Sequence, residues 1–325
     1  MIRTELDAAG IDDPRLRAAY QLCRRIAAEN GRTYFLATRL LAADQRPAVH
    51  ALYAFARLAD DILDDLDPNL DADARGAQLQ ALAGRFFGGG DRLGDPVLAA
   101  VDHTVARYRI SHALFEDFLA SMRMDLTVTE YRDRAELNRY MRGSAEVIGL
   151  QMLPVLETVV DPKEAEPYAA ALGRAFQLTN FLRDVDEDLV RDRVYLPMDE
   201  LMAFGVDREL LRWCHDHRCT HPRVRDALVA QHEITRQIYG FAEAGIALLA
   251  PRSRPCVSTA LTLYSEILNC IEDCDFAVFD HRAAVGTARR LRVAGTALFQ
   301  SWRARTVVPP TSLGTKLRHP KHGAA

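Results

Sequence analysis

The chain is a succession of helix-length segments in which apolar residues recur every three or four positions, and this periodicity limits its fold more than any other feature. Gly, Pro and Asn-Gly breaks separate the segments. No segment has the sustained apolar–polar alternation, or the Gly-flanked β-branched run, that predicts a strand. The fold class is therefore predicted to be all-α, and nothing in the chain resembles a linker between domains.

Capping residues and prolines place the expected helices. Asp44 is predicted to cap the long helix that ends near Pro68, and Ser111 to cap a helix that ends near Leu126. The other expected helices are 14–29, 33–42, 71–87, one that starts at Asp95-Pro96, 134–160, 162–189, 207–214, 223–249, 255–276 and 281–304. Residues 1–305 are expected to form one domain, and 306–325 a disordered basic tail.

Composition excludes several classes of protein. The net charge of −4 gives no electrostatic reason to expect a nucleic acid partner. Six cysteines scattered over 325 residues indicate a reducing cytoplasm rather than a disulfide scaffold. The acids of MIRTELDAAGIDD do not fit the apolar core of a signal peptide, and no apolar run reaches 18 residues, so the chain is expected to be neither exported nor membrane-spanning. Arginines in 289–305 suit either a solvated face or peripheral contact with anionic lipid at the inner membrane face.

The run YAFARLADDILDD, residues 53–65, places acids along one face of an expected helix. At about 100° per residue, Asp60 and Asp64 share a face with Tyr53 and Arg57, and Asp61 is turned further round. Carboxylates one turn apart repel each other, and a bridging Mg²⁺ would offset that repulsion. The alternative is a solvated acidic helix end.

A second polar stripe makes the metal hypothesis stronger. Gln177, Asn180, Asp184 and Asp188 share a helical face, and their oxygens are of the kind that Mg²⁺ accepts. Nearby arginines offer forks for phosphate oxygens. The two stripes together suit a diphosphate, and a carbocation left by its departure would need a dry, aromatic pocket. Candidate lining residues are Tyr34, Phe35, Tyr140, Ile148, Leu153, Phe176 and Phe181.

Four longer motifs carry a resemblance to a known family: RTYFLATRLL, ALYAFARLADDILDD, YMRGSAEVIGLQMLP and QLTNFLRDVDEDLVRDRVYLP. In this order and spacing they resemble the squalene and phytoene synthases, the head-to-head trans-isoprenyl diphosphate synthases. The resemblance runs from about Arg32 to the end of the last expected helix. It implies one all-α isoprenoid synthase domain, a helical bundle around a central cavity with two aspartate-rich helices facing each other, and Mg²⁺ or Mn²⁺ as cofactor.

The resemblance also implies roles for individual residues. The catalytic acids would be Asp60, Asp64, Asp184 and Asp188, which with Asn180 would bind the metal. The substrate contacts would be Arg32, Thr33, Tyr34, Tyr53, Arg57, Tyr140, Ser144, Ile148, Gly149, Gln177, Asn180, Arg183, Arg193 and Tyr195. Where many members read His-Ser-Lys-Ser-Phe, this chain reads Asn-Gly-Arg-Thr-Tyr from Asn30. A hydroxyl that contacts diphosphate in those members is absent at Gly31.

The family joins two identical prenyl diphosphates through a cyclopropyl diphosphate intermediate. The run YMRGSAEVIGLQMLPVL and the compact length resemble bacterial phytoene synthases, so the expected substrate is geranylgeranyl diphosphate and NADPH is not expected to be needed. The alternatives are squalene or dehydrosqualene formation from farnesyl diphosphate, and a non-catalytic relative that acts in assembly or binding. A head-to-tail elongase fits Asp60–Asp64 but not the second motif.

The segment Cys214–His221, CHDHRCTH, is a candidate of another kind. Its side chains are of the types that bind zinc, but their spacing matches no standard finger. It is expected to be an exposed polar turn, with a zinc site as the alternative.

Overall fold

The computed structural model describes residues 2–64, 71–88 and 94–280, and the side chains of residues 2, 3, 32, 33 and 64 lie outside this description. In these ranges the chain is helical. In the described ranges, β-type backbone pairing is limited to two isolated bridges, Glu130 with Val194 and Thr158 with Leu249. The prediction of an all-α fold is confirmed.

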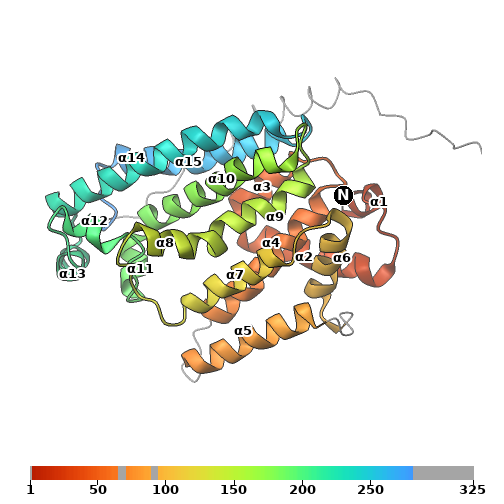
Figure 1. Ribbon diagram of the computed structural model, residues 1–325, viewed down its shortest axis with the longest axis horizontal. Coiled ribbons are helices and arrows are strands. Elements are labelled where there is room, and N and C mark those ends of the chain that lie inside the picture. The colour runs from red at the N-terminus through yellow and green to blue at the C-terminus, as the bar shows by residue number, and fades with distance from the viewer. Residues whose placement is uncertain (1, 65–70, 89–93, 281–325) are drawn as a thin grey trace, which may run out of the picture.

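The helices form one long bundle in which early and late segments of the chain lie side by side (Figure 1). They are α1 (Ile2–Ala8), α2 (Pro14–Asn30), α3 (Arg32–Thr38), α4 (Arg46–Asp64), α5 (Ala72–Phe87), α6 (Pro96–Tyr108), α7 (Ala113–Met124), α8 (Arg134–Met141), α9 (Val147–Leu156), α10 (Pro162–Arg183), α11 (Val185–Val190), α12 (Met198–Met202), α13 (Arg208–His217), α14 (Pro222–Ala244) and α15 (Arg254–Asp273). A π-helical segment, Arg142–Glu146, joins α8 to α9, and a 3₁₀ segment, Gly245–Leu248, follows α14.

Aspartate caps fix the starts of several helices. Asp13 and Asp95 each accept a hydrogen bond from the backbone N–H three residues later, and each precedes a proline at the start of its helix. Asp161 caps α10 through the N–H of Lys163, again just before a proline. These contacts confirm the predicted starts at residues 14, 96 and 162.

Other predicted boundaries are wrong. The helix expected over 134–160 contains a π-helical turn and ends at Leu156, and the helix expected over 162–189 breaks at Asp184. The side chain of Ser111 does not cap α7, whose N-cap is His112. The apolar spacing continues through the π-helical turn and past Asp184, so this local pattern marks neither change.

Smaller differences concern helix lengths. The α3 helix ends at Thr38 rather than residue 42, and α14 ends at Ala244 rather than residue 249, while α1 and α12 were not predicted. The helix expected over 281–304, the arginine cluster within 289–305 and the basic tail lie outside the described residues.

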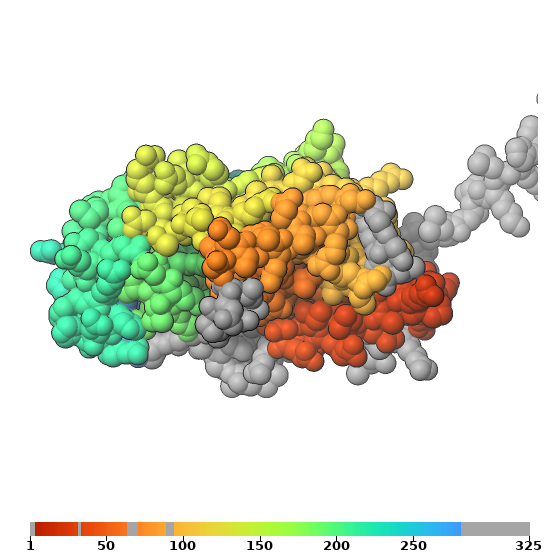
Figure 2. Space-filling model, turned by 90° about the horizontal axis from the view of Figure 1, so that it is seen from below, coloured from red at the N-terminus to blue at the C-terminus, as the bar shows by residue number. Residues whose placement is uncertain are grey.

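Packing places a layer of long helices over the N-terminal ones. Helix α10 packs against α14, α9 and α15, while α2 packs against α4 and α6. Figure 2 shows the N-terminal helices at one end of the long axis and the segment around α11–α13 at the other. No described helix combines the length and the apolarity needed to cross a membrane.

The apolar core is divided, and this division leaves room for a cavity. One large cluster belongs to the N-terminal helices, with Phe55, Phe86 and Phe115 in mutual ring contact. A second cluster belongs to α8 and the helices from α10 onward. A third, small cluster that includes Leu153 and Leu249 lies at one end between them. A carbon chain can therefore run between the clusters without disrupting either large core.

Two glycines bring α9 and its preceding π-helical turn against α10. A Cβ on Gly149 would lie 2.2 Å from the carbonyl oxygen of Ala169, and a Cβ on Gly173 would lie 2.3 Å from that of Ala145. Only a residue without a side chain permits such close approach of two helix backbones. The two helices that bound the cavity are thus held at a fixed separation.

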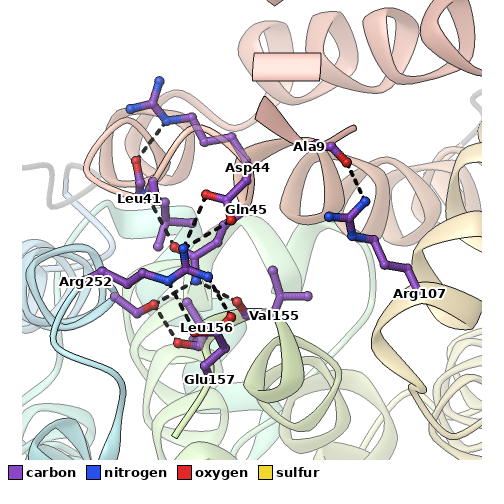
Figure 3. Close-up of polar contacts among 12 residues, drawn as sticks. Ala9, Leu41, Asp44, Gln45, Arg107, Val155, Leu156, Glu157 and Arg252 are labelled. Atoms are coloured by element: carbon purple, nitrogen blue, oxygen red, sulfur yellow. Dashed lines mark hydrogen bonds and ion pairs between the residues drawn. The ribbon is translucent and has the colours of Figure 1, made fainter. Parts of the chain in front are cut away.

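A polar network holds the C-terminal end of α9 (Figure 3). Arg252 pairs with Asp44 at 3.1 Å and with Glu157 at 2.6 Å. The fully buried amide of Gln45 donates to the carbonyl oxygen of Val155 at 2.7 Å and to the hydroxyl of Ser253 at 2.9 Å. Segments far apart in sequence are thereby tied together at this end of the molecule.

Candidate active site

An elongated cavity of about 500 Å³ lies between α3, α4, α9, α10 and α15. Val49 and Asp60 both line it from α4, and at 1.5 Å per residue they stand roughly 16 Å apart. The predicted site residues that line it are Tyr34, Tyr53, Asp60, Tyr140, Ser144, Ile148, Gly149, Gln177, Asn180, Arg193 and Tyr195. The side chains of three other predicted residues, Arg32, Thr33 and Asp64, lie outside the description.

One end of the cavity is apolar and the other polar. Apolar side chains from α3, α4, α9, α10 and α15 line its greater part, among them Ala37, Leu52, Leu153, Leu172 and Val257. Asp60, Gln177, Asn180, Arg191 and Arg193 gather toward the C-terminal ends of α4 and α10 and the loop after α11. This division suits a ligand with a charged head and a long hydrocarbon tail.

Aromatic rings line the middle of the cavity. Tyr34 and Tyr53 stack with ring centroids 5.2 Å apart, and Phe176 stacks on Tyr264 at 4.2 Å. Tyr264 on α15 was not predicted, because it lies in a segment without a motif. Two predicted lining residues are elsewhere: Phe35 stacks on His50, and Phe181 stacks on Tyr195 outside the cavity wall.

The first acidic stripe divides between cavity and solvent. Asp60 lines the cavity, whereas the side chain of Asp61 is 54% exposed. Arg57 forms an ion pair with Asp61 one turn later, and it is not among the lining residues. The structure therefore separates Asp60 from Asp61 as the helical wheel predicted, but Arg57, predicted on the face of Asp60, does not line the cavity.

The second stripe is divided by a bend. Gln177 and Asn180 line the cavity from the last turns of α10, but Asp184 has φ −104° and ψ 16° and separates α10 from α11. Arg183 holds Asp184 through two hydrogen bonds, of 2.8 and 2.5 Å. Arg183, Asp184 and Asp188 are not among the residues that line this cavity, and α10 ends before Asp184. Their expected roles in binding metal and diphosphate stay predictions.

The electrostatics of the second stripe favour a bound cation. Burial, followed by the negative charge of Asp184, raises the pKa of the Asp188 carboxyl to about 7. A divalent ion would offset both effects, and the oxygen donors of Asp60, Asn180, Asp184 and Asp188 fit Mg²⁺ or Mn²⁺ in chemistry. Among the described residues, no three acidic, histidine or cysteine side chains converge on one point.

An acid that the sequence analysis missed lies in the cavity wall. Asp125 follows α7, is 8% exposed and lines the cavity. Its carboxylate accepts hydrogen bonds from the hydroxyls of Tyr140, at 2.8 Å, and Tyr195, at 3.3 Å. Arg193 donates to its backbone oxygen at 2.6 Å. No local pattern marks Asp125, since its partners come from α8 and from the loop after α11.

The segment Cys214–His221 is not the exposed turn that was expected. Helix α13 continues to His217, and Cys214 is buried. His215 contacts Asp186 through Nδ1 at 2.6 Å, and His217 stacks on Trp213 at 4.3 Å. Within the part of the chain that the structure describes, these side chains form no metal-binding group.

Comparison with known proteins agrees with the fold and the cavity. The squalene/phytoene synthase profile matches residues 27–290. The chain is 36% identical over 291 residues to the phytoene synthase of Arthrospira platensis, covering 84% of this chain and 90% of that protein. It is 33% identical over 313 residues to chloroplastic phytoene synthase 2 of Solanum lycopersicum, covering 93% and 95%.

A solved dehydrosqualene synthase, crystallised with a ligand, has the same fold. The TM-score is 0.77 at 26% identity, with 87% of this chain and 96% of that chain covered. The motifs, the helical fold and the profile match agree with one another. The chain therefore belongs to the squalene/phytoene synthase family, whose members are prenyltransferases.

Proposed function

We propose that the protein condenses two molecules of geranylgeranyl diphosphate head to head, through a cyclopropyl diphosphate intermediate, to form phytoene. The observation that carries the proposal is the elongated cavity with an apolar body and one polar end. Relatives named phytoene synthase, which match this chain at 33% and 36% identity over most of its length, support the choice of product.

The apolar body of the cavity would bind the prenyl tails. Each buried methylene contributes about 0.8 kcal/mol, so a long tail gains much of its binding free energy there. Binding of the tails would orient the diphosphates toward Arg191 and Arg193 at the polar end. The enclosed apolar wall would exclude water from a carbocation that forms between tail and head.

The residues that would hold the metal are Asp60, Asn180, Asp184 and Asp188, together with Asp64, whose side chain lies outside the description. When bound, Mg²⁺ or Mn²⁺ supplies the positive charge that neutralises diphosphate as it leaves. Arg191 and Arg193 would add charge-assisted hydrogen bonds to the phosphate oxygens. The tyrosine and phenylalanine rings in the middle of the cavity would offer their negative faces to the cation.

Product analysis tests the proposal. The purified protein is incubated with Mg²⁺ and either geranylgeranyl or farnesyl diphosphate, each with and without NADPH, and the extracted hydrocarbons are separated by chromatography. We expect phytoene from geranylgeranyl diphosphate, with or without NADPH. If hydrocarbon forms from farnesyl diphosphate but not from geranylgeranyl diphosphate, the choice of substrate is refuted. It would favour the alternative that the fold shared with the dehydrosqualene synthase suggests.

Release of inorganic diphosphate separates an enzyme from a binding protein. We expect stoichiometric release from geranylgeranyl diphosphate at saturating Mg²⁺, and none after chelation of the metal. If the protein binds both prenyl diphosphates at saturating Mg²⁺ but releases diphosphate from neither, the proposal that it is an enzyme is refuted.

A further inference from the structure

The carboxylate of Asp125 occupies a buried position at the polar end of the cavity, where an unpartnered charge would be costly. Neighbouring donors satisfy it. The hydroxyl of Tyr140 is 2.8 Å from Oδ2, the hydroxyl of Tyr195 is 3.3 Å from Oδ1, and Nη1 of Arg193 is 4.0 Å from Oδ1. The positive charge of Arg193 offsets the negative charge of the carboxylate.

The direction of these hydrogen bonds follows from the chemistry of the groups. An ionised carboxylate can only accept. Burial raises the pKa of the phenols of Tyr140 and Tyr195 above the usual value, so both remain protonated and each has one proton to donate. Both protons therefore point at Asp125. The Tyr195 oxygen in turn accepts from Nη1 of Arg193 at 3.2 Å.

This arrangement determines what the two tyrosines can offer a ligand. A phenol whose O–H already donates a hydrogen bond can offer only its oxygen lone pairs to another group. Neither Tyr140 nor Tyr195 then has a proton for a diphosphate oxygen, although both line the cavity. An oxygen held in this way presents negative potential instead, which is what a developing carbocation requires.

We propose that Asp125 is a positioning residue: it accepts the hydrogen bonds of the Tyr140 and Tyr195 hydroxyls and so fixes the Tyr140 oxygen as an acceptor that faces the reacting carbon chain. The inference rests on the proposed function. It assigns Asp125 to stabilisation of the cation and not to binding of the diphosphate. Its signature is consequently a loss of turnover at nearly constant substrate affinity.

The test uses the full-length protein with the substitution Asp125→Asn. The amide keeps the shape of the carboxylate but has two N–H donors, so one tyrosine must accept where it previously donated. We expect kcat to fall about a hundredfold, the cost typical of losing one oriented polar group in an active site. We expect KM to stay within about threefold, since no diphosphate contact is removed.

A double-mutant cycle shows whether Asp125 acts through Tyr140. If it does, Tyr140→Phe and the double variant Asp125→Asn/Tyr140→Phe have kcat values within about threefold of each other, because residues that act as a unit are non-additive. If the fold-loss in kcat of the double variant equals the product of the losses of the two single variants, the proposal is overturned. NMR of protein labelled at the tyrosine Cζ adds a second readout, in which Asp125→Asn should shift two tyrosine signals.

The matched control is Glu200→Gln, the same chemical change outside the cavity. Glu200 on α12 accepts from Arg134 at 2.9 and 2.6 Å and from Gln231 at 2.6 Å. We expect this variant to unfold at a lower temperature with unchanged kcat and tyrosine signals. An Asp125→Asn variant with wild-type kcat would overturn the proposal, whereas a wild-type protein inactive on both prenyl diphosphates would refute the proposed function instead.

Discussion

Substitution of Gly149 by alanine examines how α9 and α10 hold the cavity open. The new Cβ would lie 2.2 Å from the carbonyl oxygen of Ala169 and 2.9 Å from its carbon, while ordinary contact begins at 3.4 Å. The deficit to the oxygen is 3.4 − 2.2 = 1.2 Å. Both contact atoms belong to a helix backbone, so no side chain can move aside. The helices themselves must separate.

The magnitude follows from two opposing effects. Overpacking a well-packed interior costs about 1–3 kcal/mol, and replacing a helical glycine by alanine gains about 1 kcal/mol. We therefore expect Gly149→Ala to lower the free energy of unfolding by up to about 2 kcal/mol. Gly240 is the control: it is exposed on α14 with no heavy atom within 4 Å of its Cβ position. Gly240→Ala should raise the free energy of unfolding by about 1 kcal/mol.

Urea unfolding followed by far-ultraviolet circular dichroism compares the two variants with the wild type. Gly149→Ala should also lose turnover, because Ile148 and Gly149 would shift relative to Gln177 and Asn180 across the cavity. Equal stabilisation by the two substitutions would refute the close approach of α9 to α10. So would a Gly149→Ala variant with full activity.

Three further predictions concern charge. Asp60→Asn should abolish diphosphate release, whereas Asp61→Asn, which removes only a surface ion pair with Arg57, should retain most activity; equal losses in a pyrophosphate assay would contradict the assigned face. The second concerns Asp188, whose raised pKa of about 7 means that Mg²⁺ must displace a proton below that pH. Apparent Mg²⁺ affinity should fall about five- to sixfold from pH 7 to pH 6, because the ionised fraction of this carboxyl falls from about one half to about one eleventh. Calorimetry in two buffers should detect proton release that Asp188→Asn removes. Third, burial lowers the pKa of His50 to about 3, so the unfolded state binds a proton below pH 6.5 while the folded state does not. Stability should therefore decline as the pH falls, by about 2 kcal/mol from this residue between pH 7.5 and 5. In urea unfolding, His50→Phe should reduce the acid-side decline in the free energy of unfolding by that amount.

Local signals were sufficient for much of the fold. Asp-Pro pairs at residues 95–96 and 161–162 predicted helix starts that the caps confirm, since a capping carboxylate and a proline act within one turn. The π-helical turn at Arg142–Glu146 had no such signal, because RGSAE continues the apolar spacing around it. Its geometry depends on helices that arrive from elsewhere in the chain, and a local pattern cannot contain that information.

Local helical spacing likewise predicted some of the site residues and not others. Asp60, Gln177 and Asn180 were predicted from helical spacing, and each lines the cavity. Asp184 was predicted on the same face, but it lies at the break between α10 and α11, where Arg183 donates to its carboxylate, and it is not among the lining residues. Asp125 was missed because it belongs to no repeat, and its role follows only from tyrosines that tertiary structure brings to it.

The network that ties the C-terminal end of α9 to the start of α4 has a consequence for how product length could evolve or be engineered. Gln45 and Ser253 hold the carbonyl oxygens of Val155 and Leu156, and Leu156 itself lines the cavity. Exchange of either polar side chain would leave a buried backbone carbonyl without its partner, which costs stability. The side chains of wall residues such as Leu52 and Leu172 are hydrocarbon and make no hydrogen bond, so their exchange leaves no polar group without a partner. Selection for longer or shorter products should therefore accumulate changes along the wall and leave this end of the cavity as a conserved anchor.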